Sequence, residues 1–378
     1  MFEKARLVKI VLLAFSATLL STMATEAMPM KTSKDATPIT VIETAKPIII
    51  AHRGASGERP EHTLASYTLA IEQGADFIEP DLVLTKDGVL VARHENEISG
   101  TTNVASHSEF AARKRTQIID GEVITGWFTE DLTLAELKTL RARERLPQLR
   151  PANTAYDGQF EVPTFQEIID LVKTEEKAKG RRIGIYPETK HPTHFATIGL
   201  PFEDELLRVL TANGYTKKTD PIFIQSFEVN NLKALRPKTK LRLIHLMASQ
   251  GAPYDQVIAG NSTPWTAMLS DAGLKAIGRF ADGIGVEKAL IMPRDATGKS
   301  TAPTDLVARA HEAGLKVHAW TFRAENYFLP TELREGDTAS PNYLAQHGNL
   351  KAEIRAAFAL GLDGLFTDFP GIGDEARR

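Results

Sequence analysis

Two acidic residues in the first quarter of the sequence have the spacing of a metal site. Glu79 and Asp81 are two residues apart in the apolar run Asp76–Leu82, so their carboxylates point to the same side of an extended strand. Like charges held that close repel each other, and a proton or a cation relieves the repulsion. Glu188, which ends a later apolar run, is the natural third donor. Because all three donors are oxygens and the chain has no cysteine, the set favours a hard divalent ion.

Ionisable residues at other strand ends could supply acid–base and anion-binding groups. His52 and His94 each end an apolar run, and two imidazoles can act as general acid and general base near neutral pH. Arg53 and Lys190 add fixed positive charge, which suits a phosphate group. Together these groups indicate phosphoryl transfer. The alternative is structural: the histidines could serve packing alone, and the two cations could simply pair with the neighbouring carboxylates.

The elements that must position these residues are short apolar runs separated by amphipathic segments. Nine such runs occur along the chain: Pro47–His52, Asp76–Leu82, Val89–His94, Ile183–Glu188, Ile222–Phe227, Leu241–Leu246, Gly283–Glu287, Val317–Phe322 and Gly364–Asp368. Several are almost continuous in isoleucine, valine and leucine, as strands buried on both faces are. Amphipathic segments such as Thr63–Gln73, Glu203–Asn213 and Thr304–Ala313 lie between them. This α/β alternation predicts a parallel sheet with helical crossovers.

One of the nine runs is not expected to be parallel. Asp87-Gly88 precedes Val89–His94, and Asp-Gly between apolar runs is a hairpin signal, so this run should fold back on the strand before it. Eight parallel strands remain, which is the count of a closed (β/α)8 TIM barrel. Such barrels carry their working residues at the carboxyl ends of the strands. Those ends also contain Gln225, Ser226, Phe227, His245, Glu287, Trp320 and Asp368.

Two long segments interrupt the alternation, and we expect both at the rim of the barrel. Residues 95–163 form a loop-rich insertion with one clear helix, Leu134–Arg141, and residues 324–349 are rich in proline, glycine and asparagine. The basic stretch Arg141–Arg150 has the character of a solvated helix face that leads into a loop. No linker divides residues 46–378, so we expect one barrel domain there.

The composition excludes one class of partner. The 378 residues carry a formal net charge of −3 and are 42% hydrophobic, as in an ordinary globular protein. No tract rich in lysine and arginine alternates with aromatic residues, so we expect no binding to nucleic acid. The oligomeric state is open at this level.

The first 27 residues have the pattern of a secretory signal peptide. Lys4, Arg6 and Lys9 precede the uncharged stretch Ile10–Thr25, and small residues follow it. The stretch is marginal as a membrane span, which needs about 20 strongly apolar residues. We therefore expect cleavage, an extended lead-in over residues 28–45, and export without a stable membrane anchor, to the periplasm or beyond it. An exported chain without cysteine must be stabilised by its core alone.

Several longer motifs together resemble one known family. They are AHRGASGERPEHTLASYTLAIEQGADFIEPDLVLTKDGVLVARHE (residues 51–95), IGIYPETKHP, IQSFE, ADGIG, VHAWTFR and GLFTDFP, and they span Pro47–Pro370. The chain resembles the glycerophosphodiester phosphodiesterase family, and the PEHT spelling and the insertion after His94 are most similar to its periplasmic bacterial branch. The resemblance implies an α/β barrel and hydrolysis of glycerophosphodiesters to an alcohol and sn-glycerol 3-phosphate.

The resemblance also implies a role for each candidate residue. In this family two histidines form the acid–base pair, three carboxylates hold a divalent ion, and basic and aromatic side chains bind the glycerol phosphate. The motif positions assign His52, His94 and Arg53 to catalysis, Arg53, Lys190, Phe227 and Trp320 to the substrate, and Glu79, Asp81 and Glu188 to the metal. We expect Ca²⁺ rather than Mg²⁺ as the ion, and small glycerophosphodiesters as the substrates.

Two departures from the family pattern and two alternatives accompany this prediction. Many relatives have asparagine where this chain has His62, and aspartate where it has Glu95, so local hydrogen bonds could differ. A related lipid phosphodiesterase, such as a lysophospholipase D or a phosphoinositide phospholipase, would need an apolar rim, whereas residues 95–163 are mostly polar. A binding protein that had lost its chemistry would not need intact histidines and carboxylates. The alcohol group of the substrate is left open.

Overall fold

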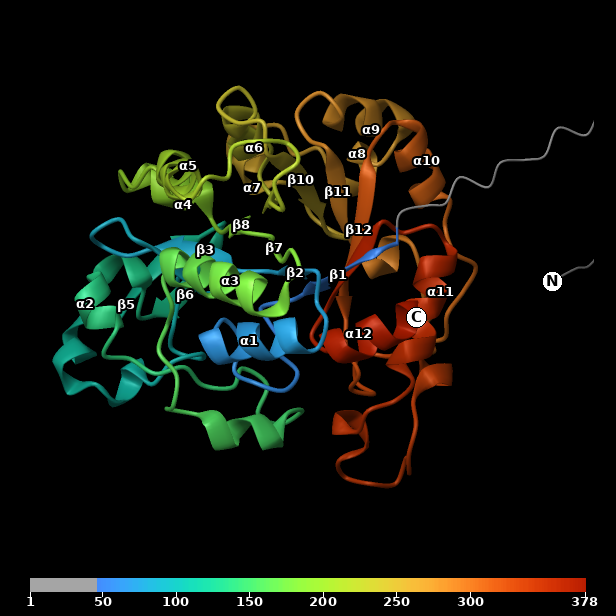
Figure 1. Ribbon diagram of the computed structural model, residues 1–378, viewed down its shortest axis with the longest axis horizontal. Helices are drawn as coiled ribbons and strands as arrows, with labels where there is room; N and C mark the ends of the chain where they lie inside the picture. The colour runs from blue at the N-terminus through green and yellow to red at the C-terminus, as the bar shows by residue number, and fades with distance from the viewer. Residues whose placement is uncertain (1–45) are drawn as a thin grey trace, which may run out of the picture. The chain divides into compact units, whose positions relative to one another are not determined.

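The central sheet of the computed structural model is built from short strands that pair around a curled surface (Figure 1). Among the described residues, 46–378, eleven strands pair in the order β4 (Leu90–Ala92), β3 (Asp81–Leu84), β8 (Glu188–Thr189), β9 (Phe223–Ser226), β10 (Arg242–Met247), β11 (Gly283–Glu287), β12 (Lys316–Phe322), β13 (Gly364–Thr367), β1 (Ile48–Ala51), β2 (Phe77–Ile78) and β7 (Gly184–Ile185). The predicted signal peptide and lead-in fall on residues 1–45 and lie outside the described residues.

Two of the strands are each interrupted by a proline. β2 and β3 are the two parts of one strand that breaks at Pro80, and β7 and β8 are the two parts of another that breaks at Pro187. Backbone hydrogen bonds continue across both breaks, from Tyr186 N to Ile78 O and from Glu188 N to Pro80 O. Counted in this way, the described part of the chain contains eight parallel strands whose pairing closes into a ring. The predicted (β/α)8 barrel is therefore confirmed.

The ninth apolar run forms the predicted antiparallel hairpin. β4 pairs with β3 in the register Leu84 to Leu90, and Asp87-Gly88 lies in the turn between them. Gly88 has a φ of 76°, a left-handed conformation that favours glycine. The hairpin brings His94, which follows β4, to the edge of the barrel mouth.

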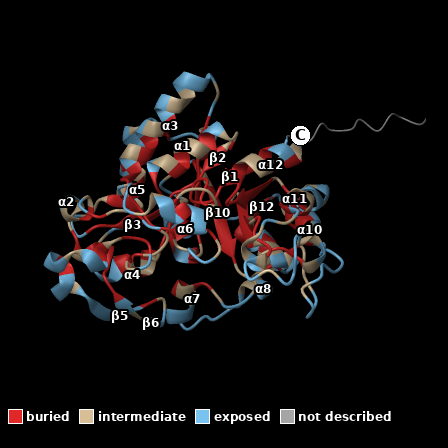
Figure 2. Cartoon of the chain, turned by 90° about the horizontal axis from the view of Figure 1, so that it is seen from below, coloured by how far each residue is buried: buried red, intermediate tan, exposed pale blue. Residues whose placement is uncertain are grey.

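Helices pack around the outside of the barrel, and the buried residues concentrate between them and the strands (Figure 2). The α-helices are α1 (Leu64–Glu72), α2 (Leu134–Leu137), α3 (Phe165–Lys179), α4 (Pro192–Thr197), α5 (Phe202–Ala212), α6 (Val229–Leu235), α7 (Tyr254–Ile258), α8 (Trp265–Met268), α9 (Asp271–Ile277), α10 (Leu306–Glu312), α11 (Leu350–Ala359) and α12 (Pro370–Arg377). The 3₁₀ turns are η1 (Val104–Ser106), η2 (Ser108–Arg113), η3 (Thr129–Asp131), η4 (Pro151–Tyr156), η5 (Lys288–Leu290), η6 (Thr331–Leu333) and η7 (Tyr343–Ala345). Within residues 46–378, no helix combines the length and the apolar character that a membrane span requires.

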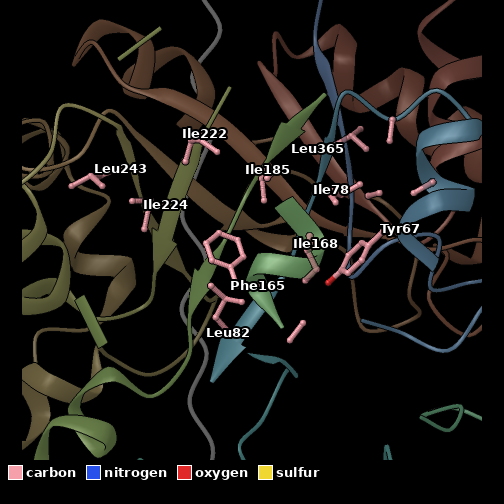
Figure 3. Packing of buried hydrophobic residues seen from close by; sticks show 14 of the residues in the cluster. Tyr67, Ile78, Leu82, Phe165, Ile168, Ile185, Ile222, Ile224, Leu243 and Leu365 are labelled. Atoms are coloured by element: carbon pink, nitrogen blue, oxygen red, sulfur yellow. The ribbon is translucent and has the colours of Figure 1, made fainter. Parts of the chain in front are cut away.

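Helix α3 illustrates how local sequence fixes a crossover helix to the barrel. Thr164 and Glu167 form a capping box at its start, and Gly180, with a φ of 62°, ends it. Its buried face begins with Phe165, which belongs to the same buried apolar cluster as Leu82 of β3; Figure 3 labels both side chains. The helix packs against β4 and β7, the strands next to the two parts of the strand that carries Glu79 and Asp81.

Large side chains fill the barrel interior beneath the strand ends. The cluster consists of Ile50, Phe77, Tyr186, Phe223, Ile244 and Phe366. The buried Tyr186 hydroxyl and His318 Nδ1 are hydrogen-bonded at 2.7 Å, so neither polar group is left unpaired in the core. This packed interior gives the site a rigid floor, to which Phe366 contributes.

The insertion over residues 95–163 contains a hairpin that the sequence analysis missed. β5 (Arg115–Ile119) and β6 (Glu122–Gly126) pair antiparallel around Asp120-Gly121. Both turn residues have positive φ, 47° and 88°, as a two-residue type I′ turn requires. The Asp-Gly signal was thus present in the sequence.

The predicted helix Leu134–Arg141 is wrong in length, because α2 ends at Leu137.

Candidate active site

The carboxyl ends of the barrel strands surround a cavity of about 530 Å³. The predicted site residues that line it are His52, Arg53, Glu79, His94, Glu188, Lys190, Phe227 and Trp320. Asp81, the remaining predicted site residue, lies behind this lining and is 1% exposed. Barrel closure therefore brings residues from both halves of the sequence to one site.

The three predicted metal ligands converge. One carboxylate oxygen from each of Glu79, Asp81 and Glu188 lies within 4.8 Å of the other two, and all three side chains are buried. The strands explain the convergence, because Asp81 of β3 pairs in register with Glu188 of β8. Glu79 is oriented by two donors, Gln225 Nε2 at 2.6 Å and the Arg53 backbone N–H at 3.1 Å. Asp81 Oδ1 has no hydrogen-bond partner among the described residues.

The electrostatics of this cluster fit a cation. Burial raises the pKa of Glu79 well above its ordinary value, and the Asp81 and Glu188 carboxylates reinforce the shift. Burial also raises the pKa of Glu188 to about 8, although Lys190 opposes this shift. Asp81 remains ionised: burial works against its charge, but His62 holds its pKa well below the ordinary value. A buried carboxylate cluster with an unpartnered oxygen is a suitable donor set for a hard divalent ion.

Both cations near the cluster make the ion pairs considered from the sequence. Arg53 Nε lies 3.4 Å from Asp81 Oδ2, and Lys190 Nζ donates to Glu188 Oε1 at 2.8 Å. Arg53 Nη1 also donates to Glu61 at 3.0 Å. The two cations line the same cavity as the carboxylates, so they can serve both the cluster and an anionic ligand.

His52 is held at the end of β1 by a sharp turn and a buried carboxylate. Its Nδ1 lies 2.5 Å from Asp368 Oδ1, and its Nε2 lies 4.0 Å from Glu79 Oε2. Since an ionised carboxylate only accepts, the proton sits on Nδ1 and Nε2 is free to accept a proton in the cavity. Burial, reinforced by Arg53, lowers the pKa of His52 to about 4, which keeps the ring neutral. Gly54 has a φ of 90°, and a Cβ there would lie 2.3 Å from Ser66 Oγ.

His94 has a similar arrangement in the loop after β4. Its Nδ1 is hydrogen-bonded to the Glu95 carboxylate, and its ring is 29% exposed at the cavity. Burial, with Arg53 and Lys190 adding to it, lowers the pKa of His94 well below the ordinary value. Both histidines are thus neutral imidazoles with a carboxylate on Nδ1, which is the form a general base requires.

Aromatic side chains form one wall of the cavity. Phe227 and Trp320 meet edge to face with ring centroids 5.8 Å apart, and Trp320 Nε1 donates to the Gly285 carbonyl at 3.1 Å. Lys190 Nζ lies 5.8 Å from the centre of the Phe227 ring, so the wall adjoins the cationic part of the site. The arrangement offers an apolar surface beside an anion-binding position.

Three residues of the site were not assigned a role from the sequence. Asp368 ends a predicted strand, yet only the closed barrel shows that its carboxylate is hydrogen-bonded to His52 Nδ1. Gln225 also lies at a predicted strand end, and its Nε2 donates to Glu79 and orients it. His62, one of the departures from the family pattern, is fully buried and bonds Asp81 Oδ2 at 3.0 Å and the Tyr67 hydroxyl at 2.8 Å.

His245, another strand-end residue, does not reach the cavity. It lies beside Phe280 with ring centroids 5.9 Å apart, and neither ring nitrogen has a hydrogen-bond partner among the described residues. Burial lowers the pKa of His245 to about 4. It is a packing residue between the barrel and its helices.

His245 should make the fold sensitive to acid. Below pH 6.5 the unfolded chain binds a proton on this residue, whereas the folded chain does so only near pH 4. Stability should therefore fall as the pH falls through this window, by about 2 kcal/mol between pH 7 and pH 5. Urea unfolding of the wild type and of His245→Leu at both pH values measures the effect. The same pH dependence in both proteins would contradict it.

A comparison with models of protein families matches residues 52–372 to the "Glycerophosphoryl diester phosphodiesterase family". The chain belongs to this family. The match runs from His52, the first predicted catalytic residue, to α12 near the end of the chain. The family predicted from the sequence motifs is therefore confirmed.

Individual glycerophosphodiester phosphodiesterases are similar over most of their length. The chain is 38% identical over 344 residues to one from Arabidopsis thaliana, which covers 87% of this chain and 86% of the relative. It is 30% identical over 349 residues to one from Haemophilus influenzae, with 87% and 89% covered. The more specific prediction, a periplasmic bacterial branch, stays a prediction.

Solved structures of the family share the fold. A putative glycerophosphoryl diester phosphodiesterase from Silicibacter pomeroyi has a TM-score of 0.61 at 20% identity and covers 88% of this chain and 94% of that structure. A phosphodiesterase from Oleispira antarctica, solved in complex with the product sn-glycerol-3-phosphate, has a TM-score of 0.56 at 21% identity, with 87% and 96% covered. At 20% and 21% sequence identity, these two comparisons show that the chain shares their fold.

Proposed function

We propose that this chain hydrolyses glycerophosphodiesters to an alcohol and sn-glycerol 3-phosphate. One observation carries the proposal: two histidines, each with a carboxylate on Nδ1, line the same cavity as Glu79 and Glu188, and Asp81 completes the buried carboxylate cluster behind them. Family membership and a structural relative that binds sn-glycerol-3-phosphate support it. No feature of the cavity favours the lipid phosphodiesterases or a binding protein over this activity.

The two histidines divide the proton transfers. One accepts the proton of the glycerol 2-hydroxyl, whose oxygen attacks phosphorus to form a cyclic phosphate. The other must enter this step as an imidazolium, whose charge the phosphodiester anion and the carboxylate on Nδ1 stabilise. It donates its Nε2 proton to the alkoxide that leaves, so the alcohol departs neutral. Water then opens the ring with the two roles reversed. The products together contain the diester plus one water.

Charged and aromatic side chains hold the diester for these steps. Arg53 and Lys190 neutralise phosphoryl oxygens, and Phe227 and Trp320 pack against the glycerol carbons. Glu79, Asp81 and Glu188 would hold the divalent ion, which would stabilise negative charge on the phosphoryl group. We favour Ca²⁺, because Mg²⁺ is usually bound by one or two protein carboxylates and this site offers three.

We also propose that the chain is exported and that the periplasm is its destination. Three basic residues before an uncharged apolar stretch at residues 10–25, followed by small residues, support this proposal. The segment falls outside the described residues. Sequencing the amino terminus of the protein from a periplasmic extract would test it, and an intact Met1 in the cytosolic fraction would overturn it.

A substrate panel tests the proposed activity. Released sn-glycerol 3-phosphate is measured with glycerophosphocholine, glycerophosphoethanolamine, glycerophosphoglycerol and lysophosphatidylcholine, with Ca²⁺ or Mg²⁺ added. We expect turnover of the first three compounds, because they share the glycerol phosphate half. We expect much slower release from the lysolipid. Its acyl chain would need an apolar surface, whereas the charged residues Glu287, Lys288 and Arg323 line the cavity. No release from any glycerophosphodiester with either ion would refute the proposal.

A further inference from the structure

The basic stretch Arg141–Arg150 is not the solvated helix face that the sequence suggested. It is an irregular segment, and two of its side chains turn inward: Arg150 is 6% exposed and Arg145 is 27% exposed. A guanidinium taken out of water needs carboxylates and other acceptors around it. Both arginines find them in networks that end at a catalytic histidine.

Arg150 reaches the carboxylate behind His52. Its Nη2 donates to Asp368 Oδ2, its Nε donates to Glu325 Oε1, and its Nη1 donates to the Ser56 carbonyl at 2.9 Å. Asp368 Oδ1 is the atom that lies 2.5 Å from His52 Nδ1. Ser56 lies in the turn after β1, and its hydroxyl donates to the His52 carbonyl at 2.7 Å. One guanidinium thus holds both the carboxylate partner of the histidine and the turn that follows it.

Arg145 makes the corresponding connection to His94. It forms bidentate pairs with Glu95, at 3.0 and 2.7 Å, and with Glu61, at 2.8 and 2.7 Å. Glu95 is the partner of His94 Nδ1, and Glu61 accepts from Arg53 Nη1 at 3.0 Å. One guanidinium thus fixes the partner of the second histidine and the partner of a phosphate-binding arginine.

The two networks have the same charge composition. The pairs are Asp368 and Glu325 with Arg150 and Arg323, and Glu61 and Glu95 with Arg53 and Arg145. In each set two guanidiniums face two carboxylates, and Arg53 also lies 3.4 Å from Asp81; the carboxylates can therefore stay ionised although they are partly or fully buried. An ionised carboxylate on Nδ1 fixes the tautomer and the direction of the ring.

We propose that Arg145 and Arg150 are positioning residues for the two catalytic histidines, and that the short segment between them keeps both imidazoles aligned at once. The proposal rests on the acid and base roles of His52 and His94 given above. Neither arginine lines the cavity, so neither should contribute to substrate binding. The segment is itself held by Glu144, which accepts from Asn153 Nδ2 at 2.9 Å.

The test measures the activity of the variants Arg145→Lys and Arg150→Lys on two substrates with different leaving groups, glycerophosphocholine and the p-nitrophenyl ester of glycerol phosphate. Lysine keeps the charge but replaces the planar fork with a single point of contact. With glycerophosphocholine, we expect each variant to lose about tenfold to hundredfold in kcat with little change in KM, as for other residues that orient active-site groups. Arg143→Lys is the matched control, because Arg143 belongs to the same segment but is exposed and lies 3.7 Å from Asp157.

The p-nitrophenyl ester of glycerol phosphate separates positioning from a general structural effect. Its leaving group needs no proton, so kcat/KM for nitrophenol release depends on the general base and not on the general acid. We expect one variant to recover to within a few-fold of the wild type and the other to keep its loss. Recovery identifies which histidine is the acid. Equal losses on both substrates in both variants, or losses no larger than in the control, would overturn the proposal.

Two further measurements guard against misfolding and against a wrong activity. If Arg150→Lys does not give a cooperative thermal transition like the wild type's, Arg145→Ala with added guanidinium is used, since Arg145 is partly open to solvent. Guanidinium should restore its kcat at least several-fold, and no restoration would overturn the role of Arg145. A wild type that is inactive on both substrates would refute the proposed function instead.

Discussion

Replacing His52 with alanine should reduce turnover of a glycerophosphodiester by about 10²–10⁴-fold, because the change removes one proton-transfer group. The fold should stay intact. His94→Ala should have an effect of the same size. The fold should survive the first change, since Asp368 would keep its ion pairs with Arg150 and Arg323. Steady-state kinetics with glycerophosphocholine, together with the thermal unfolding midpoint, measure both quantities.

An exposed histidine provides the control for these variants. His311 lies on α10, and its Nε2 is 2.8 Å from Asp363 at the protein surface. His311→Ala should retain wild-type turnover. Turnover near the wild-type level in either active-site variant, measured on a folded protein, would remove that histidine from the mechanism.

Removing the divalent ion should abolish activity and also lower thermal stability. A chelator should reduce turnover to a few per cent or less, and added Ca²⁺ should restore it, since the buried carboxylates would otherwise repel one another. An ion bound only by the folded state stabilises it by about 2.7 kcal/mol at 100 times its Kd. The unfolding midpoint should therefore rise with Ca²⁺ concentration, which is a readout independent of catalysis.

Asp81→Asn tests the ligand assignment behind this expectation. Loss of a direct ligand should weaken activation by Ca²⁺ by at least about 100-fold, beyond the 10–100-fold typical of groups behind the ligands. Glu122→Gln is the control, because Glu122 is an exposed carboxylate at the start of β6. If the chelator left both activity and the unfolding midpoint unchanged, the carboxylate cluster would not be a functional metal site.

The elements of the barrel could be predicted from local patterns in the chain, because each depends on local chemistry. A continuous apolar run such as Ile48–Ala51 is typical of a strand buried on both faces, and Asp87-Gly88 predicted the hairpin that leaves eight parallel strands. The same turn signal occurs at Asp120-Gly121, but the short runs beside it mix polar with apolar residues and are mostly exposed, so that hairpin gains little from burial and has no clear strand pattern.

The sequence also determined the main candidate residues, since carboxyl ends of parallel strands meet at one face of a barrel. The hydrogen bonds and ion pairs that connect these residues could not be predicted in this way. His52 and Asp368 are 316 positions apart, and no local pattern relates them. Arg145 and Arg150 have the composition of a solvated stretch, yet the closed barrel and its insertion enclose them among carboxylates. Local burial and turn preferences fix the strands, whereas pairings between distant charges exist only once the strands have closed into a ring.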